Sequence, residues 1–585
     1  MRYRKCNFPA GPKAIAIALA SILPLSSVHA LDINTGNPNF TARWDNTFKY
    51  SNLWRIEGPQ SKVLGNNPVD PISSLNYNDG DNNFSDTGPV SNRVDLLTEL
   101  DLAWKSSFGV RASAAAWYDS VYNQPNANKT GASNSYSVGP TKFTKETRDI
   151  MGRYVELLDA FAWDKGMVGG MPFTVRVGRH TLQYGETLFY GGNGIANAQG
   201  PIDVIKLLSV PGSQFKEILR PVGQASFNLQ ASENLTFDGY YQFQWEESRL
   251  PAAGSYLSTA DFVGPGSETF LVAGPPNFGP VPVGFVRRGD MPADNQGQGG
   301  FAIHYTPPDS DYRFGLYFAN YHEKAPELYV APYATGPRFE NGMVTIGQWE
   351  QVYPENIKTF GASVTSSIGQ LNWAAEVSWR IDQPLNSDPV TVIPGTTADN
   401  NNHPLYAVGN TMHANVNGLY VLQPNKFWQG GVVLAEAAWN YVMECTRNCG
   451  PEASNGFSPT GAVDPNTTEH AIIFRILFDP AYFQVLPGLD IDLPIGIGYN
   501  PYGRSRAIGG GGPFSVEHGG DVEVGINGKY QQNWQFGLSY THYIGNANTF
   551  TVNNTKFVVG PLQYLPFDQP LLDRDFVSFN IHRTF

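Results

Sequence analysis

Apolar and polar residues alternate over many short stretches of this chain. In residues 371–381, Trp373 and Trp379 share one face of an extended strand, while Glu376 and Arg380 share the other. Side chains of a strand point to opposite faces with period two, so this stretch predicts a ribbon that is apolar on one side only. The same pattern recurs at residues 40–50, 93–104, 110–118, 155–163, 173–177, 225–231, 235–246, 301–305, 312–321, 360–368, 433–441, 472–478, 489–499, 522–530, 534–540 and 577–585.

These ribbons predict the fold class. Most approach the roughly 9–11 residues that a tilted membrane strand requires. Single-chain bacterial barrels have even strand numbers, so about seventeen ribbons predict an all-β protein, a transmembrane antiparallel β-barrel of 16–18 strands. Aromatic residues such as Trp104, Trp163 and Tyr530 end many apolar faces, as in the interfacial girdles of membrane barrels. The alternative is a secreted β-sandwich or propeller, but no propeller repeat of about 40–50 residues is evident.

The last ribbon ends in an aromatic residue at the carboxy terminus. Its apolar face consists of Val577, Phe579, Ile581 and Phe585. Such a strand resembles the sorting signal of bacterial outer-membrane barrels. It implies as partners the barrel-assembly machinery and a lipid bilayer with its lipopolysaccharide.

The amino-terminal segment has the order of a secretory signal peptide. Basic residues up to Lys13 precede an apolar run at 14–25, and Ala30 ends a small-residue cleavage site. We expect residues 1–30 to be removed and residues 31–585 to form one outer-membrane barrel domain. The alternative is an uncleaved anchor, although the run is shorter than the roughly 20 residues of a membrane helix.

Charge and cysteine content narrow the functions further. Loss of the four basic residues of the signal takes the net charge from -13 to -17, which disfavours a nucleic-acid partner. The mean hydropathy of -0.29 suits a barrel, because polar lumen residues dilute the apolar belt. Two cysteines remain after the signal, Cys445 and Cys449, and in an exported chain they predict a disulfide.

Long Pro-, Gly- and Asn-rich stretches separate the ribbons, at 58–92, 123–146, 183–221, 251–297, 382–428 and 446–467. So many long insertions exceed a simple meander, so we expect some to fold into the lumen, with residues 183–221 the main candidate. Charges at membrane depth must face the interior and pair. Candidate lumen or constriction residues are therefore Arg176, Arg179, Glu186, Asp203, Lys206, Glu217, Arg220, Glu376 and Arg380. The alternative is an outer loop with solvated charges.

One loop has a weak resemblance to a calcium-binding loop. Asp79 and Asp81 flank Gly80 among several Asn residues, and alternating carboxylate and amide oxygens suit Ca²⁺. No Glu stands at the closing position of an EF-hand. A loop whose side chains cap their own backbone is the favoured interpretation, and no metal or other cofactor is expected.

Several separated motifs together resemble the domain of unknown function 1302 family, large predicted outer-membrane barrels of Gram-negative bacteria. They are NDGDNNF at 78–84, VGRHTLQYGE at 177–186, PIDV at 201–204, the segment 211–221, STADF at 258–262, NYH at 320–322 and DRDF at 573–576. One departure is Tyr184, where family members more often have Trp. The resemblance covers nearly the whole mature chain and implies an exporter or uptake channel for lipid-, sterol- or hydrocarbon-like compounds.

Two transport functions remain open. The first is a channel for hydrophobic or amphipathic small molecules, with a lumen filled by loops. The second is a general porin for polar solutes, favoured by charges on lumen faces such as Glu376 and Arg176. A surface adhesin is a third, more distant possibility. No enzyme is predicted, since the chain has no Gly-x-Ser-x-Gly elbow, His-Glu-x-x-His pair or phosphate-binding loop.

Overall fold

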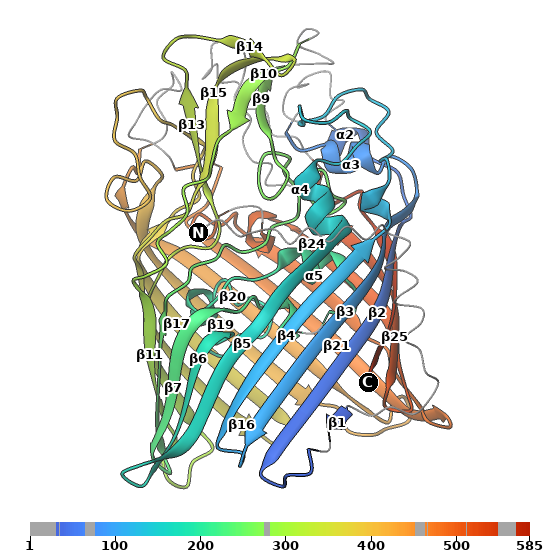
Figure 1. Cartoon of the computed structure of the whole chain (residues 1–585), viewed down its shortest axis with the longest axis vertical. Coiled ribbons are helices and arrows are strands. Elements are labelled where there is room, and N and C mark those ends of the chain that lie inside the picture. The colour runs from blue at the N-terminus through green and yellow to red at the C-terminus, as the bar shows by residue number, and fades with distance from the viewer. Residues whose placement is uncertain are drawn as a thin grey trace.

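Eighteen antiparallel strands close into a barrel in the computed structural model, as the sequence predicts (Figure 1). The wall consists of β2 (Phe40–Arg55), β3 (Gly88–Trp104), β4 (Phe108–Asp119), β5 (Arg153–Val168), β6 (Met171–His180), β7 (Val222–Ser232), β8 (Leu235–Gln242), β11 (Gln298–Tyr305), β12 (Arg313–Tyr321), β16 (Ile357–Ile368), β17 (Leu371–Pro384), β19 (Val408–Val421), β20 (Gly430–Arg447), β21 (His470–Leu486), β22 (Leu489–Asp492) with β23 (Ile495–Tyr502), β24 (Gly519–Tyr530), β25 (Trp534–Ile544) and β26 (Phe576–Thr584). β22 and β23 together occupy one position, because both pair with β21 and β24.

The structure describes residues 31–33, 35–64, 76–213, 215–273, 281–450, 463–464, 466–509, 512–547 and 569–585. The predicted signal peptide, residues 1–30, lies outside the described residues. A short strand, β1 (Leu31–Ile33), pairs with the start of β2.

The terminal ribbon closes the ring. β26 pairs with β25 on one side and with β2 on the other. The carboxy-terminal residue extends this seam, since Phe585 and Asn46 exchange backbone hydrogen bonds of 2.8 and 2.9 Å. Closure leaves no unpaired edge in the ring, which is what a membrane-spanning sheet requires.

The two faces of the wall differ as the alternation predicts. On β17, Val377 and Trp379 are 38% and 44% exposed and point outward, whereas Glu376 and Arg380 are buried on the inner face. Exposed aromatic rings such as Trp104 recur near the strand ends. An outward apolar belt with flanking aromatics is the surface that contacts lipid.

Turns at one end of the barrel are short, for example residues 105–107 and 369–370, whereas the connections at the other end are long. In outer-membrane barrels the short turns are periplasmic and the long loops are extracellular. The extracellular loops carry a second sheet above the barrel (Figure 1), formed by β9 (Thr269–Ala273), β10 (Val283–Arg287), β13 (Glu327–Pro332), β14 (Arg338–Glu340), β15 (Met343–Val352) and β18 (Val390–Thr391).

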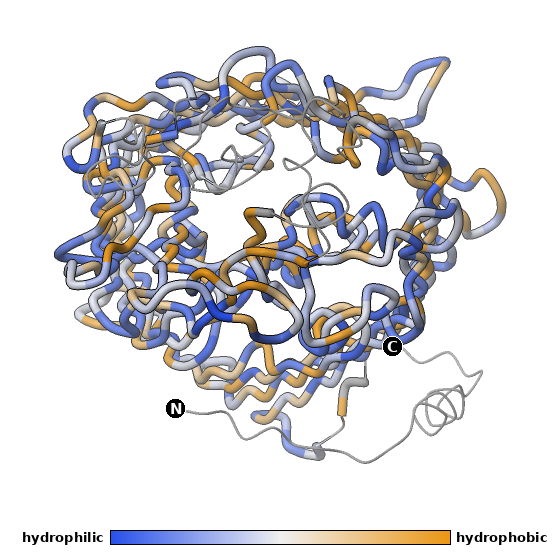
Figure 2. Tube along the Cα trace, turned by 90° about the horizontal axis from the view of Figure 1, so that it is seen from above, coloured by the Kyte–Doolittle hydropathy of each residue, from blue (hydrophilic) through white to orange (hydrophobic). Residues whose placement is uncertain are grey.

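Helices are short and belong to the loops: α2 (Ser61–Leu64), α3 (Asp79–Asn83), α4 (Lys145–Thr147), α5 (Val204–Ser209) and α6 (Phe215–Ile218), with 3₁₀ turns η1 (Val121–Asn123), η3 (Ile195–Ala198) and η4 (Pro513–Ser515) and a π turn η2 (Arg148–Gly152). None of the helices among the described residues is long and apolar enough to cross a membrane. Seen along the barrel, several chain segments lie within the ring of strands (Figure 2).

Each of the seventeen predicted ribbons coincides with a wall strand, and the eighteenth strand, β19, was missed. It lies within residues 382–428, which were wrongly predicted as one loop. Its inner face is polar, with Thr411, His413 and Asn415, and its glycines and asparagines resemble a turn-rich stretch. The extracellular sheet was also missed, because β9 and β10 lie in the predicted loop 251–297.

Candidate functional site: the interior of the barrel

Residues 183–221, here called the inner segment, contact inward-facing side chains on both sides of the barrel. Tyr184 packs against Tyr240 of β8 and Tyr317 of β12. On the other side, Glu217 pairs with Lys49 of β2 at 3.2 Å. The segment therefore has partners on strands that are far apart around the ring.

One wall carboxylate binds three consecutive backbone amides of the inner segment. Oε2 of Glu436, on the inner face of β20, accepts hydrogen bonds from the N–H groups of Leu188 (3.1 Å), Phe189 (2.5 Å) and Tyr190 (3.1 Å). Glu436 is only 2% exposed. Hydrogen bonds to a charged acceptor are stronger than neutral ones, so Glu436 is a main anchor of the segment.

A second carboxylate holds the next turn of the inner segment. Glu376 accepts from the N–H of Glu186 at 2.5 Å and from the N–H of Ile195 at 2.9 Å. A Cβ at Gly194 would lie 2.3 Å from Oε1 of Glu376, so any larger residue here would displace this carboxylate from its present position. The neighbouring Arg380 donates from Nη2 to the carbonyl oxygens of residues 192, 193 and 194, at 3.0, 2.9 and 2.9 Å.

Between these anchors, Asn193 is enclosed by polar side chains of β19 and β20. Its Nδ2 donates to Oδ1 of Asn415 at 2.8 Å, and its Oδ1 lies 3.0 Å from Nδ1 of His413 and 3.2 Å from Nδ2 of Asn440. All four side chains are at most 1% exposed. A buried network in which each polar group has a partner fixes one position of the segment against the wall.

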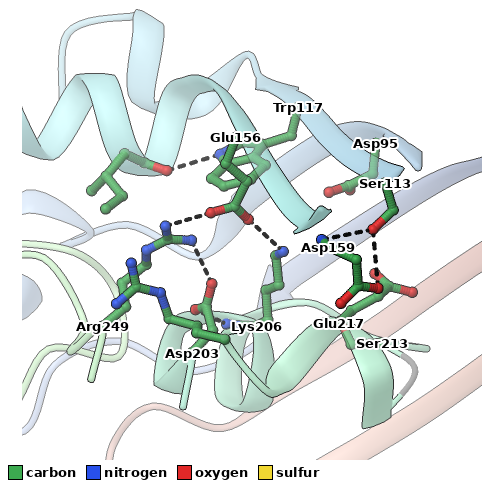
Figure 3. Close-up of polar contacts among 12 residues, drawn as sticks. Asp95, Ser113, Trp117, Glu156, Asp159, Asp203, Lys206, Ser213, Glu217 and Arg249 are labelled. Carbon is green, nitrogen blue, oxygen red and sulfur yellow. Dashed lines mark hydrogen bonds and ion pairs between the residues drawn. The ribbon is translucent and has the colours of Figure 1, made fainter. Parts of the chain in front are cut away.

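An ion-pair cluster holds α5 to the opposite wall (Figure 3). Glu156 of β5 pairs with Nζ of Lys206 at 2.8 Å and with Arg249 at 2.5 Å. Arg249 also pairs with Asp203 at 2.6 Å, and Asp203 caps α5 by accepting from the N–H of Lys206. The ammonium of Lys206 lies over the Trp117 ring at 5.1 Å. Because each of these charges is buried with an opposite charge, removal of one would leave its partner uncompensated.

The end of the inner segment has further ion pairs. Lys216 pairs with Glu99 of β3 at 2.5 Å. Arg220 and Arg179 share the carboxylate of Glu246, at 2.8 and 2.7 Å. Arg179 thus lies at the extracellular rim of the wall rather than beside the other predicted constriction residues.

A lysine from an extracellular loop holds the end of the 3₁₀ turn η3. Nζ of Lys324 donates to the carbonyl oxygens of Asn197 (3.3 Å), Ala198 (3.5 Å) and His322 (3.1 Å). Burial, with a smaller contribution from nearby Arg380, lowers the pKa of Lys324 to about 8.

Towards the periplasmic end, inward-facing polar side chains are exposed instead of buried. Examples are Asn228, Arg313, Asn372 and Lys529, and the predicted candidate Arg176 belongs to this group. The interior therefore has two levels: a buried polar network around the inner segment and an accessible polar lining below it.

The predicted candidates thus fall into separate groups. One group holds the first turn of the inner segment and consists of Glu186, Glu376 and Arg380. A second group is the α5 cluster, with Asp203 and Lys206. The others form separate ion pairs, Glu217 with Lys49 and both Arg179 and Arg220 with Glu246, whereas Arg176 belongs to the exposed lining. The sequence reasoning missed Lys49, Glu156, Arg249 and Glu436, to which these residues or their neighbours bind. A signal was present for Glu436, a lone charge on the polar face of the ribbon at 433–441.

The remaining predicted residues lie away from the inner segment. A disulfide joins Cys445 and Cys449, with the Cα atoms 5.7 Å apart. Both oxygens of Asp81, a weak calcium candidate from the sequence, accept from guanidinium groups: its Oδ2 lies 2.9 Å from Nη2 of Arg574, and its Oδ1 lies 3.3 Å from Nη2 of Arg55. Asp79 accepts instead from the backbone N–H of Asn134, at 2.8 Å.

Comparisons with known proteins gave one family match. The family model described as "Protein of unknown function (DUF1302)" matches residues 12–585. No curated protein matches the sequence. Solved structures that resemble the chain include Acinetobacter baumannii OccAB1, with 10% identity, a TM-score of 0.39 and coverage of 93% of this chain and 96% of that chain. Pseudomonas aeruginosa OccK2, solved in complex with glucuronate, has 9% identity, a TM-score of 0.35 and coverage of 93% and 97%. The A. baumannii outer membrane channel DcaP has 8% identity, a TM-score of 0.35 and coverage of 95% and 100%.

Proposed function

The chain belongs to the DUF1302 family, and we propose that it is a gated outer-membrane channel for amphipathic or hydrophobic small molecules, with the inner segment as its gate. The observation that carries this proposal is a set of apolar side chains left exposed inside the barrel. Leu188, Leu207 and Leu208 are 41%, 52% and 39% exposed, although all three belong to the inner segment.

The attachment of α5 explains why two of these leucines, Leu207 and Leu208, face the lumen. Lys206 binds Glu156 on the wall, and Ile205 is also buried. Residues two positions apart on a helix are rotated by about 200°, so Leu207 lies opposite Ile205 and Leu208 lies opposite Lys206. Exposed apolar side chains in an otherwise polar interior are suited to contact the apolar part of a solute.

The manner in which the inner segment is held supports its role as a gate. Glu436, Glu376 and Arg380 bind it through side chains, and the described part of the segment forms no ladder with a wall strand. It can therefore separate from the wall without breaking the backbone hydrogen bonds that close the barrel. Elements that move are drawn from those with few such bonds.

A porin for polar solutes is the second candidate, and the exposed periplasmic lining favours it. Arg176, Arg313 and Lys529 are accessible polar side chains on the inner face. This function requires a continuous aqueous path past the inner segment, whereas the contacts of residues 184–199 with β8, β12, β17 and β20 occupy that level of the barrel.

Flux through proteoliposomes distinguishes the two candidates. The amphipathic probe is a dansyl-labelled alkyl sulfonate, whose fixed charge slows its passage across lipid, and the polar probe is a sugar followed by liposome swelling. We expect faster flux of the amphiphile than of the sugar, and reduced amphiphile flux for Leu207→Asn with Leu208→Asn. The control Glu233→Gln changes an exposed residue of a periplasmic turn and leaves flux unchanged. Rapid sugar swelling together with unaltered amphiphile flux in the leucine variant would instead identify the polar-solute porin.

A further inference from the structure

Three family motifs that lie far apart in the sequence meet in one buried charged cluster outside the barrel interior. Asp79 and Asp81 belong to the motif at 78–84, Asp261 to the motif at 258–262, and Asp573 and Arg574 to the motif at 573–576. Arg574 Nη1 donates to the carbonyl oxygen of Tyr256 at 2.7 Å, which brings the last motif against the loop before the second. The cluster lies among the extracellular loops, where β2 ends and β26 begins.

The charges of this cluster do not balance. The members are Asp79, Asp81, Asp261, Asp573, Arg55 and Arg574, and each is at most 6% exposed. Among the described residues, four carboxylates face two guanidinium groups, which leaves an excess of two negative charges when all of them are ionised. Buried charges are ordinarily paired or bound to a metal ion, because an uncompensated one costs several kcal/mol.

The two guanidinium groups are directed to only part of the cluster. Asp81 accepts from both Arg55 and Arg574, and Asp573 lies 3.8 Å from Arg55. Asp79 and Asp261 have neither arginine as a hydrogen-bond partner. Their contacts are with backbone amides: Asp261 Oδ2 accepts from the N–H of Asp79 at 3.0 Å, and Asp79 Oδ2 accepts from the N–H of Asn134 at 2.8 Å.

The second oxygen of each of these carboxylates is buried without a partner among the described residues. The same holds for two neutral oxygens nearby, Oδ1 of Asn83 and Oγ of Ser255. Asn83 follows Asp79 by one helical turn of α3, and both face Gly254: a Cβ there would lie 2.6 Å from Nδ2 of Asn83 and 3.7 Å from Cβ of Asp79. Ser255 is the next residue, and its carbonyl oxygen would lie 2.8 Å from a Cβ at Gly80.

We propose that Asp79 and Asp261 bind a divalent cation, of which Ca²⁺ fits best, with Asn83 and Ser255 supplying neutral oxygens. The donor set is entirely oxygen and mixes carboxylate, amide and hydroxyl groups, which is the preference of a hard cation. A divalent ion cancels the excess of two negative charges. Buried polar oxygens that lack protein partners are a recognised sign of an ion or water at that place.

The pKa values of both carboxyl groups, Asp79 and Asp261, are raised. Burial, with the charge of Asp261 as the next cause, raises the pKa of Asp79 well above its usual range. Burial raises the pKa of Asp261 to about 7, to which nearby Asp81 adds. Protonation of both carboxyls is therefore the competing way to remove the excess charge, and the experiment must separate it from cation binding.

The cation would tie together the loop of α3, the loop at 252–262 and, through Asp81 and Arg574, the segment before β26. It therefore stabilises the extracellular loops and has no required part in solute passage. Failure of this inference leaves the proposed channel function standing, and the reverse also holds.

The test uses the full-length protein, purified in detergent, treated with a chelator and exchanged into chelator-free buffer at neutral pH. CaCl₂ is titrated by calorimetry, and the melting temperature is followed with and without millimolar CaCl₂. We expect one Ca²⁺ per chain and a rise in melting temperature. Asp79→Asn and Asp261→Asn should each weaken the Kd by about tenfold or more, since ligand charge sets calcium affinity over orders of magnitude.

Two further variants keep the test decisive if an aspartate variant fails to fold. Ser255→Ala removes only Oγ, which makes no hydrogen bond among the described residues, so it should fold normally and bind Ca²⁺ more weakly. Asp86→Asn changes an exposed carboxylate paired with Lys129 and should bind as wild type does. The inference is overturned if wild-type protein shows neither heat of binding nor a calcium-dependent melting temperature, or if binding persists unchanged in Ser255→Ala and in the folded aspartate variants.

Discussion

Arg574 and Asp81 form a buried ion pair across 493 positions of sequence, with Nη2 and Oδ2 2.9 Å apart. Arg574 precedes the last strand, β26, and Asp81 lies in the loop that follows the first long strand, β2. These two strands pair where the barrel closes. The ion pair therefore joins the loops on either side of the seam.

Asp81→Ala should destabilise the barrel by about 3–5 kcal/mol, because it leaves Arg55 and Arg574 buried without their shared partner. The free energy of unfolding in urea, followed by tryptophan fluorescence in detergent, measures this change. Lys129→Gln breaks an exposed pair with Asp86 and should cost less than about 1 kcal/mol. Equal effects of the two substitutions would contradict the role assigned to the seam.

Glu156→Gln should loosen α5. The substitution removes the negative charge that Lys206 and Arg249 share, although Asp203 still pairs with Arg249. We expect faster amide hydrogen exchange across residues 204–209, with wall strands unchanged. Glu233→Gln, in an exposed turn, is the matched control. Unchanged exchange in α5 would show that the ion pairs do not hold the helix.

The sequence alone predicted the wall better than the interior, for a physical reason. A strand between lipid and lumen must alternate, so ribbons such as that of Trp373 and Trp379 can be recognised locally. Strand β19 was not predicted, because its inner face carries polar residues such as His413 and Asn415, which bind the inner segment. These residues make its sequence resemble that of a turn. The need of the Lys206 charge for a partner could be predicted from the sequence, but the identity of that partner, Glu156, depends on the three-dimensional path of the chain.

The extracellular cluster should make stability depend on pH when divalent cations are absent. The pKa of Asp261 is raised to about 7 and that of Asp79 is raised also, so the folded state binds more protons than the unfolded state between about pH 4 and 7. Stability contributed by these groups is therefore greatest at acid pH and falls as the pH rises towards 7. Melting temperatures across this range measure the effect. Added CaCl₂ should reduce this loss of stability in wild type. Asp261→Asn lacks the titrating carboxyl group, so its stability relative to wild type should rise from pH 4 to 7.

Replacing both cysteines of the disulfide should have a small effect. Cys445 and Cys449 close a short loop at the end of β20, so the bond constrains the unfolded chain little. We expect a loss of about 2 kcal/mol or less in the free energy of unfolding of Cys445→Ser with Cys449→Ser. Wild-type protein with and without a reducing agent provides the comparison. Loss of the folded barrel in the double variant would show a larger role for this bond.

Single-channel recording of Glu436→Gln in planar bilayers tests the gate most directly. Glu436 binds three consecutive amides of the inner segment, and the neutral amide of glutamine accepts them more weakly. Wild type and Glu233→Gln should open rarely and conduct little, whereas Glu436→Gln should show long-lived openings of higher conductance. A large, steady conductance in wild type, unchanged in Glu436→Gln, would contradict a lumen gated by residues 183–221.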